Sequence, residues 1–266
     1  MEMREWASRI FCADCLEEKL LAPPDGLKAL TDHQPGSPVA WRRPPRPAHL
    51  QIAPKNQRKK FPHALSMAQA ESRIRCLHVF ANHELMALEM MAWALLAFPQ
   101  AEPSFRRGLA KILLDEQRHF RLYAERLAAM GLQFGDLPVN DHFWRVGSEI
   151  SNPLDWVCTM HLTFEQSNLD HAPYYGRLFR EVEDFASADL MQTIFEDELG
   201  HVRFGSRWLK HYKPADVPLF EVFAQHCSPT NPPQRAIGPE FQEQARRQAG
   251  LDDDFIRSLQ SWQPGG

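Results

Sequence analysis

Two stretches of the sequence repeat one pattern, in which an acidic residue is followed by a histidine. ILLDEQRHF contains Glu116 and His119, and IFEDELGHVRF contains Glu198 and His201. In each stretch the histidine follows the glutamate by three positions, inside an apolar run with helical periodicity. Side chains three positions apart on a helix lie on one face, about 5 to 6 Å apart at Cβ, so each pair can bind a single ion. Two such pairs predict two metal ions.

Two further glutamates extend this set of ligands. Glu84 lies 32 residues before Glu116, and Glu165 lies 33 residues before Glu198. A separation of this length fits a helix, a short turn and an antiparallel helix that returns to the same height. One Glu from each of two helices, with Glu-x-x-His from each of the other two, is the ligand arrangement of ferritin-like di-iron and di-manganese proteins. We therefore expect all six ligands to converge on one point: Glu84, Glu116, His119, Glu165, Glu198 and His201.

The charges of these residues agree with a pair of divalent ions. Four glutamates carry four negative charges, which two divalent metals neutralise. Without metal, a buried cluster of carboxylates costs roughly several kcal/mol per charge or becomes protonated. The alternative is that each Glu-x-x-His pair lies on a solvated helix face. The recurrence of the pattern among Phe, Leu, Ile and Met favours a metal site.

Three neighbouring residues are candidates for orienting the ligands. Asp115 and Asp197 directly precede the two motif glutamates and can hold the ligand imidazoles through their second ring nitrogen. The alternative for both is an exposed acid on the helix. His161 precedes Glu165 by four positions on the same face, where it is an extra ligand, a hydrogen-bond donor to the ligands or a hydrogen-bonded core histidine.

At these residues the chain resembles the ferritin-like superfamily. DEQRHF is similar to the Asp-Glu-x-Arg-His signature of di-iron oxygenases. The combination of HELMALEMMAWALLAF, DEQRHF, GDLPVNDHFW, FEQSNLD and DELGHVRFG resembles an uncharacterised bacterial ferritin-like family of unknown function. The resemblance covers most of the chain. It implies a fold and a set of metal ligands, and it implies no substrate.

The pattern of apolar residues, caps and prolines predicts an all-α chain. Its three parts are an N-terminal helix with a Pro-rich arm (1–65), a ferritin-like four-helix bundle (66–212) and a C-terminal extension of short helices (213–266). We expect an N-terminal helix over 3–21 and core helices over 66–98, over 103–130 with Gly131 as its stop, from Asn152-Pro153 with a kink or restart near Pro173, and over 187–212. A crossover at 132–152 joins the second core helix to the third. Short terminal helices are expected over 218–225, 239–249 and 252–262.

Three residues within these helices affect the choice of ligand or the stability of the helix: Glu89, Gly200 and Gly205. Glu89 competes with Glu84 and His83 for the ligand role, but it lies about 140° around the helix from Glu84, and we choose Glu84. Gly200 and Gly205 weaken the fourth core helix by roughly 1 kcal/mol each relative to Ala. We expect close helix packing, or room beside the metals, to compensate.

The segment from His33 to Leu65 is rich in proline and strongly basic. It carries seven positive charges and no acid, whereas the rest of the chain carries a net charge of −11. This segment is either a cationic strap on the chain's own acidic surface, which we favour, or a site for a phosphate-bearing partner. The seven basic residues of this arm are Arg42, Arg43, Arg46, Lys55, Arg58, Lys59 and Lys60.

Composition restricts the class of protein further. The 266 residues are 44% hydrophobic and contain no run long and apolar enough for a transmembrane helix. The N-terminus carries acids where a signal peptide has a basic start, so we expect a cytoplasmic protein. Five cysteines do not form a disulfide framework, and Cys12 and Cys15 lack the partners of a zinc or thioredoxin-like site.

The leading functional hypothesis is a di-iron protein that activates O2 to oxidise or hydroxylate a small organic substrate. Mn or a mixed Mn/Fe pair is an alternative to two Fe ions, and an electron donor is a further expected partner. A second hypothesis is a ferroxidase or iron-handling protein without an organic substrate. A third is an RNA-modifying hydroxylase that uses the basic arm. The sequence assigns no catalytic residue beyond the ligands, no substrate and no oligomeric state.

Overall fold

A computed structural model describes residues 1–50, 52–54 and 61–263. Within these ranges every regular element is a helix, and β-pairing is limited to two isolated bridges. The prediction of an all-α chain is therefore confirmed for the described residues. The chain divides into two compact units, Met1–Ser148 and Glu149–Gly266, and the boundary falls inside the segment predicted as a crossover. Four basic residues of the arm lie outside the described residues: Lys55, Arg58, Lys59 and Lys60.

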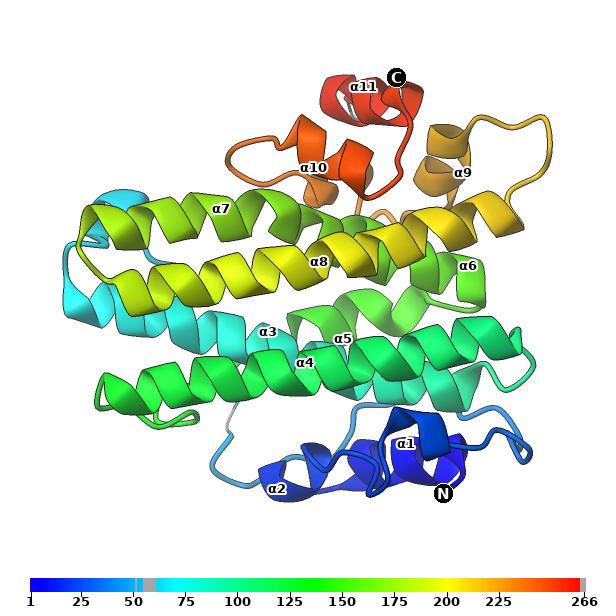
Figure 1. The fold of residues 1–266 in the computed structure, drawn as a ribbon, viewed down its shortest axis with the longest axis horizontal. Helices are drawn as coiled ribbons and strands as arrows, with labels where there is room; N and C mark the ends of the chain where they lie inside the picture. Colours follow the sequence, from blue (N-terminus) through cyan, green and yellow to red (C-terminus); the bar gives the residue numbers. More distant parts are fainter. Residues whose placement is uncertain (51, 55–60, 264–266) are drawn as a thin grey trace. The chain divides into compact units, whose positions relative to one another are not determined.

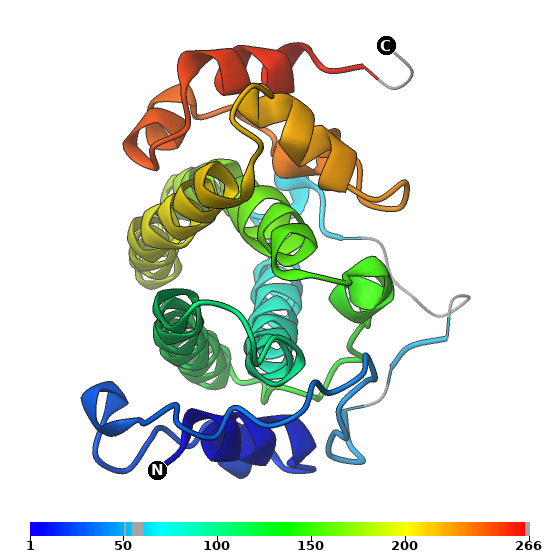
Figure 2. The same cartoon turned by 90° about the vertical axis from the view of Figure 1, so that its right-hand side faces the viewer.

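The first unit is built around two long helices. Its elements are α1 (Met3–Cys12), α2 (Leu16–Lys19), η1 (Leu27–Ala29), η3 (Ala64–Ser66), α3 (Ala70–Ala97), α4 (Pro103–Ala129), α5 (His142–Val146) and, at the boundary, η4 (Gly147–Glu149). α3 and α4 lie side by side, joined by a short turn after Pro99 (Figure 1). α1 packs against α3 and buries Trp6, Ile10 and Phe11 completely. Figure 2 shows this N-terminal segment, in blue, along the helix pair.

The N-terminal helix is shorter than predicted. Instead of one helix over 3–21, α1 ends at Cys12, and the chain is extended at Ala13 and Cys15 before the short α2. The break allows Lys19 to fold back, so that its ammonium donates to the carbonyl of Ile10 at 3.4 Å. Lys19 is fully buried. An amphipathic helix over 3–21 would instead place this lysine on its solvent-exposed polar face.

Part of the basic arm lies on the first unit as the strap hypothesis expects. Arg46 binds the carboxylate of Glu89 at 2.6 Å, and Lys19 approaches the same carboxylate at 3.3 Å. Arg43 pairs with Asp141 at 2.8 Å. Glu89 is fully buried, and the positive charges of Arg46 and Lys19 balance the charge of its carboxylate.

The second unit also contains a long helix pair. Its elements are α6 (Pro153–Trp156), η5 (Val157–Glu165), α7 (Gln166–Glu181), α8 (Phe185–Tyr212), α9 (Leu219–His226), η6 (Pro233–Ala236), α10 (Glu243–Gln248) and α11 (Asp253–Ser261). α6, η5 and α7 follow one another without a break, and α7 and α8 lie side by side (Figure 1). The short helices α9 and α10 contact α8 (Figure 2).

Side-chain caps begin three helices of this unit, with Asn152 before α6, Asp184 before α8 and Asp252 before α11. The side chain of Asn152 accepts hydrogen bonds from the backbone N–H groups of Leu154 and Asp155, which caps the predicted start of the third core helix. The expectation of a restart at Pro173 is wrong, because α7 continues through this residue. An interior proline removes one hydrogen bond and crowds the carbonyl four residues earlier, but the hydrogen bonds of the flanking turns continue the helix through Pro173.

A buried ion pair attaches the C-terminal segment to α7. Both carboxylate oxygens of Asp170 accept hydrogen bonds from the guanidinium of Arg246, at 2.7 and 2.8 Å. The backbone N–H groups of Gly238 and Gln242 donate to the same carboxylate. Both charged side chains are fully buried, so their pairing determines whether this segment can pack.

The two glycines of α8 differ in their surroundings. A Cβ at Gly205 would lie 2.6 Å from Cβ of His161 and 3.1 Å from the side chain of Leu162. The prediction of close packing is confirmed at Gly205. At Gly200 a Cβ would have no neighbour within 4 Å among the described residues, so close packing does not apply there, and the alternative of room beside the metals stays a prediction.

Candidate metal centre

In the first unit, three of the predicted ligands form one buried cluster. Glu84 comes from α3, whereas Glu116 and His119 come from α4. Nδ1 of His119 lies 3.6 Å from a carboxylate oxygen of Glu84 and 3.7 Å from one of Glu116. One ligand atom from each residue falls within 4.8 Å of the others, and each residue is at most 5% exposed. These distances allow one ion to contact all three residues after small side-chain movements.

The electrostatics of this cluster also fit a cation. Burial raises the pKa of Glu84 well above its usual value, and the neighbouring charge of Glu116 raises it further. His119 acts in the opposite direction. Two carboxylates in a dry environment repel each other, and a divalent ion between them removes this cost.

The second unit holds a matching cluster. Glu165 is the last residue of η5, and Glu198 and His201 lie on α8. Nδ1 of His201 is 3.3 Å from Glu198 and 3.9 Å from Oε1 of Glu165. Oε1 of Glu165 is buried and accepts no hydrogen bond from the residues that the structure describes. A buried carboxylate oxygen that lacks a donor needs a cation or a proton, so these residues also fit a metal ion.

Hydrogen bonds from the same unit orient the carboxylates of this second cluster. The indole N–H of Trp156 donates to Nε2 of His161 at 3.1 Å, which places the ring hydrogen on Nδ1. Nδ1 of His161 then donates to Oε2 of Glu165 at 2.5 Å. The amide Nδ2 of Asn168 donates to Oε1 of Glu198 at 2.9 Å. Each glutamate therefore has one oxygen held by a neighbour.

The backbone of η5 is a π-helix, a rare conformation that is frequent at functional sites. It carries both His161 and Glu165. Neither this conformation nor the hydrogen bonds of Trp156 and Asn168 were predicted from the sequence. Asn168 follows Glu165 by three positions, so the helical spacing that identified the ligands could also have identified this donor.

The remaining candidates have different surroundings. Asp115 is half-buried and approaches Arg118 at 3.5 Å, and Asp197 is half-buried on α8. The ring of His83 stacks on Phe143, with centroids 5.1 Å apart. The carboxylate of Glu89 forms ion pairs with Lys19 and Arg46. The convergence of all six ligands on one point stays a prediction, because the two clusters belong to separate units.

The fold and these clusters define the class of the molecule. It is an all-helical protein with two glutamates and a histidine buried together in each of two compact units. No helix in the described ranges has the length and apolar character needed to cross a membrane. The model of the family described as "Protein of unknown function (DUF455)" matches residues 7–257, and the chain belongs to this family.

A distant relative of the chain has no described activity. An uncharacterised protein of Haemophilus influenzae is 27% identical over 167 residues, which are 60% of this chain and 56% of the relative. The match therefore spans little more than half the length of that protein. No solved structure matches the chain.

Proposed function

We propose that the protein is a di-metal carboxylate protein of ferritin-like type, with two Fe ions as the expected metals. The observation that supports this proposal is the repetition of one buried set, a glutamate from one long helix beside a Glu-x-x-His pair on the next, in both units. A solvated helix face does not account for either set, because all six residues are at most 5% exposed.

The residues of each unit have distinct roles in this proposal. Glu84, Glu116 and His119 hold one ion, and Glu165, Glu198 and His201 hold the other. His161 keeps its proton on Nδ1 and fixes the orientation of the Glu165 carboxylate. When bound, two redox-active ions supply the electrons with which proteins of this class activate O2. The surrounding apolar side chains exclude water from both clusters.

We further propose that the reaction is the oxidation or hydroxylation of a small organic substrate. Ferroxidase activity without an organic substrate is the alternative, and it uses the same ligands. The RNA hypothesis has less support, because Arg43 and Arg46 of the basic arm pair with acids of their own unit.

The test is metal loading under anaerobic conditions followed by exposure to air. We expect about two Fe per chain, magnetic coupling between the oxidised ions as the resemblance to di-iron proteins implies, and O2 consumption that requires the bound iron. The double variant Glu116→Gln/Glu198→Gln removes one carboxylate from each cluster and should lose both ions. Binding of two ions by this variant would contradict the assignment of the ligands.

A further inference from the structure

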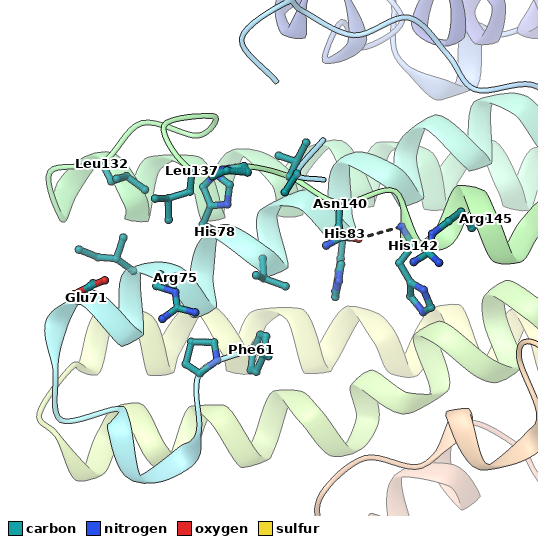
Figure 3. A pocket seen from close by; sticks show the side chains of 16 residues that line it. Phe61, Glu71, Arg75, His78, His83, Leu132, Leu137, Asn140, His142 and Arg145 are labelled. Carbon is teal, nitrogen blue, oxygen red and sulfur yellow. Dashed lines mark hydrogen bonds between the residues drawn. The ribbon is translucent and has the colours of Figure 1, made fainter. Parts of the chain in front are cut away.

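The first unit contains a cavity that shares no lining residue with the metal clusters. Its volume is about 650 Å³, within the range of roughly 300 to 1,000 Å³ typical of small-molecule sites. Residues of α3, of the loop after α4 and of α5, together with Phe61 and Pro62, form its walls (Figure 3). The aliphatic and aromatic part of the lining comes from Phe61, Ile74, Val79, Leu132, Leu137 and Val139.

The polar part of the lining has an excess of hydrogen-bond donors. Nε2 of His78 accepts from the backbone N–H of Gly135 at 3.2 Å, so Nδ1 carries the ring hydrogen. This Nδ1 donates to no residue in the described part of the chain, although the side chain is only 2% exposed. Burial lowers the pKa of His78 to about 4, which keeps the ring neutral at pH 7. The neutral, buried ring of His78 therefore offers one N–H donor to the cavity that it lines.

Two further donors line the same cavity. The side-chain oxygen of Asn140 accepts from the backbone N–H of His142 at 3.0 Å, the bond drawn in Figure 3, which leaves its Nδ2 as a donor. Arg145 uses Nε to bind Asp141 at 3.1 Å, and its terminal nitrogens donate to no described residue. His78 is buried, Asn140 is half-buried and Arg145 is exposed, and donors that face a cavity without an acceptor favour a ligand that brings oxygen acceptors.

The charges of the lining residues favour a negatively charged acceptor on the ligand. Arg75 and Arg145 are cationic, and Glu71 is the acidic residue among the described lining residues. A guanidinium binds a carboxylate with charge-assisted hydrogen bonds, which are roughly twice as strong as neutral ones. We propose that this cavity binds a small organic carboxylate with an apolar body, such as a medium-chain fatty acid. Its carboxylate accepts from the cavity's donors, and its chain lies against the aliphatic wall.

Calorimetry with three ten-carbon probes tests this site on the full-length protein. Decanoate should bind once per chain and at least about 10-fold more tightly than decan-1-ol, and decyltrimethylammonium should bind more weakly still. Metal-free and metal-loaded protein should bind decanoate alike, because no lining residue belongs to the metal clusters. Equal affinity for decanoate and decan-1-ol, or no binding of decanoate below its micellar concentration, would overturn the proposal.

Substitutions assign the binding to this cavity. Arg145→Gln changes a side chain that is 47% exposed, so the fold should persist while decanoate binding weakens about 10-fold. Val79→Phe narrows the cavity and should weaken decanoate and decan-1-ol together. Arg107→Gln, which replaces an exposed arginine outside the cavity, is the matched control and should bind as the wild type does. Unchanged decanoate binding in both cavity variants would also overturn the proposal.

Discussion

The imidazole of His119 is completely buried between two carboxylates, and its substitution separates a metal role from simple packing. His119→Gln keeps a polar side chain of similar size, so a core histidine without a metal role should lose no more than about 1 to 2 kcal/mol of stability. For a ligand, we expect bound metal to fall from about two ions per chain toward one. Metal analysis after anaerobic Fe(II) loading measures this change.

The control for this variant is His171→Gln. His171 makes a hydrogen bond to the backbone carbonyl of Ser167 and belongs to neither cluster, so this variant should keep both ions. Two ions in His119→Gln would remove His119 from the metal centre.

His78 predicts a pH dependence of stability that is independent of metal. Its pKa is about 4 in the folded protein, because burial disfavours the charged ring, and about 6.5 when exposed. Between these values the unfolded chain binds a proton that the folded chain does not, so the free energy of unfolding falls as the pH decreases from 6.5 to 4. The contribution reaches roughly 3 kcal/mol below pH 4.

Urea denaturation of wild type and His78→Gln at pH 7 and pH 4.5 measures this contribution. Gln retains an acceptor for the N–H of Gly135 and does not titrate. The variant should therefore lose less stability on acidification than the wild type. An equal loss in both proteins would contradict the buried, neutral state of His78.

At the residue scale, the sequence predicted which glutamates and histidines lie together within each unit, but not the residues that hydrogen-bond to them. Glu84 and Glu165 could be predicted because spacing along helices converts directly into position on a face. Trp156 could not, because its contact with His161 depends on the π-helical backbone between them. The cavity donors were also missed, since Asn140 and Arg145 lie in a segment without periodicity.

At the scale of elements, the glycines of α8 give a matched pair of substitutions. Gly205→Ala places a methyl group against His161 and Leu162, and we expect a loss of about 1 to 3 kcal/mol from overpacking, reduced by the better helix propensity of alanine. The methyl group of Gly200→Ala has no neighbour within 4 Å among the described residues, so this variant should be more stable than the wild type by about 0.5 to 1 kcal/mol. Thermal denaturation of the metal-free variants measures both effects, and a stabilised Gly205→Ala would show that α8 and η5 are not in close contact.

Helix ends were predictable where a local signal determines them. Pro103 begins α4, and Gly131, with φ of +85°, follows its end as expected. The first core helix begins at Ala70 and not near Ser66, because residues Ala64–Ser66 form a separate 3₁₀ turn. The end of α1 at Cys12 depends on the burial of Lys19 beside Glu89, a contact between distant segments that local periodicity does not contain.

For the whole molecule, metal should act as a stabilising ligand. At free metal concentrations about 100-fold above the dissociation constant, each site adds about 2.7 kcal/mol, so two sites add roughly 5 kcal/mol. For a chain of this size we expect Tm to rise by roughly 10 °C or more. Calorimetry of metal-free protein with and without Fe(II) under anaerobic conditions measures the shift. The same shift in Glu116→Gln/Glu198→Gln would show that the metal stabilises the chain from another site.

The division into two units limits what pattern alone can predict about the whole molecule. The eight expected helices were anticipated approximately, but the boundary after Ser148 was not. It depends on which segments pack together, and the short helices α9 and α10 join the second unit through contacts with α8. Such long-range contacts have no signature in local periodicity.

The pair formed by Asp170 and Arg246 has a consequence for protein synthesis. The two residues are 76 positions apart, and at about 5 to 20 residues per second the ribosome needs roughly 4 to 15 seconds to add the arginine after the aspartate. Until then the carboxylate of Asp170 has no cation beside it, and burying it uncompensated costs roughly several kcal/mol. The nascent second unit therefore completes its packing only after residue 246 has been translated. A chain truncated before that residue keeps its apolar helix faces exposed and becomes a substrate for chaperones and proteases.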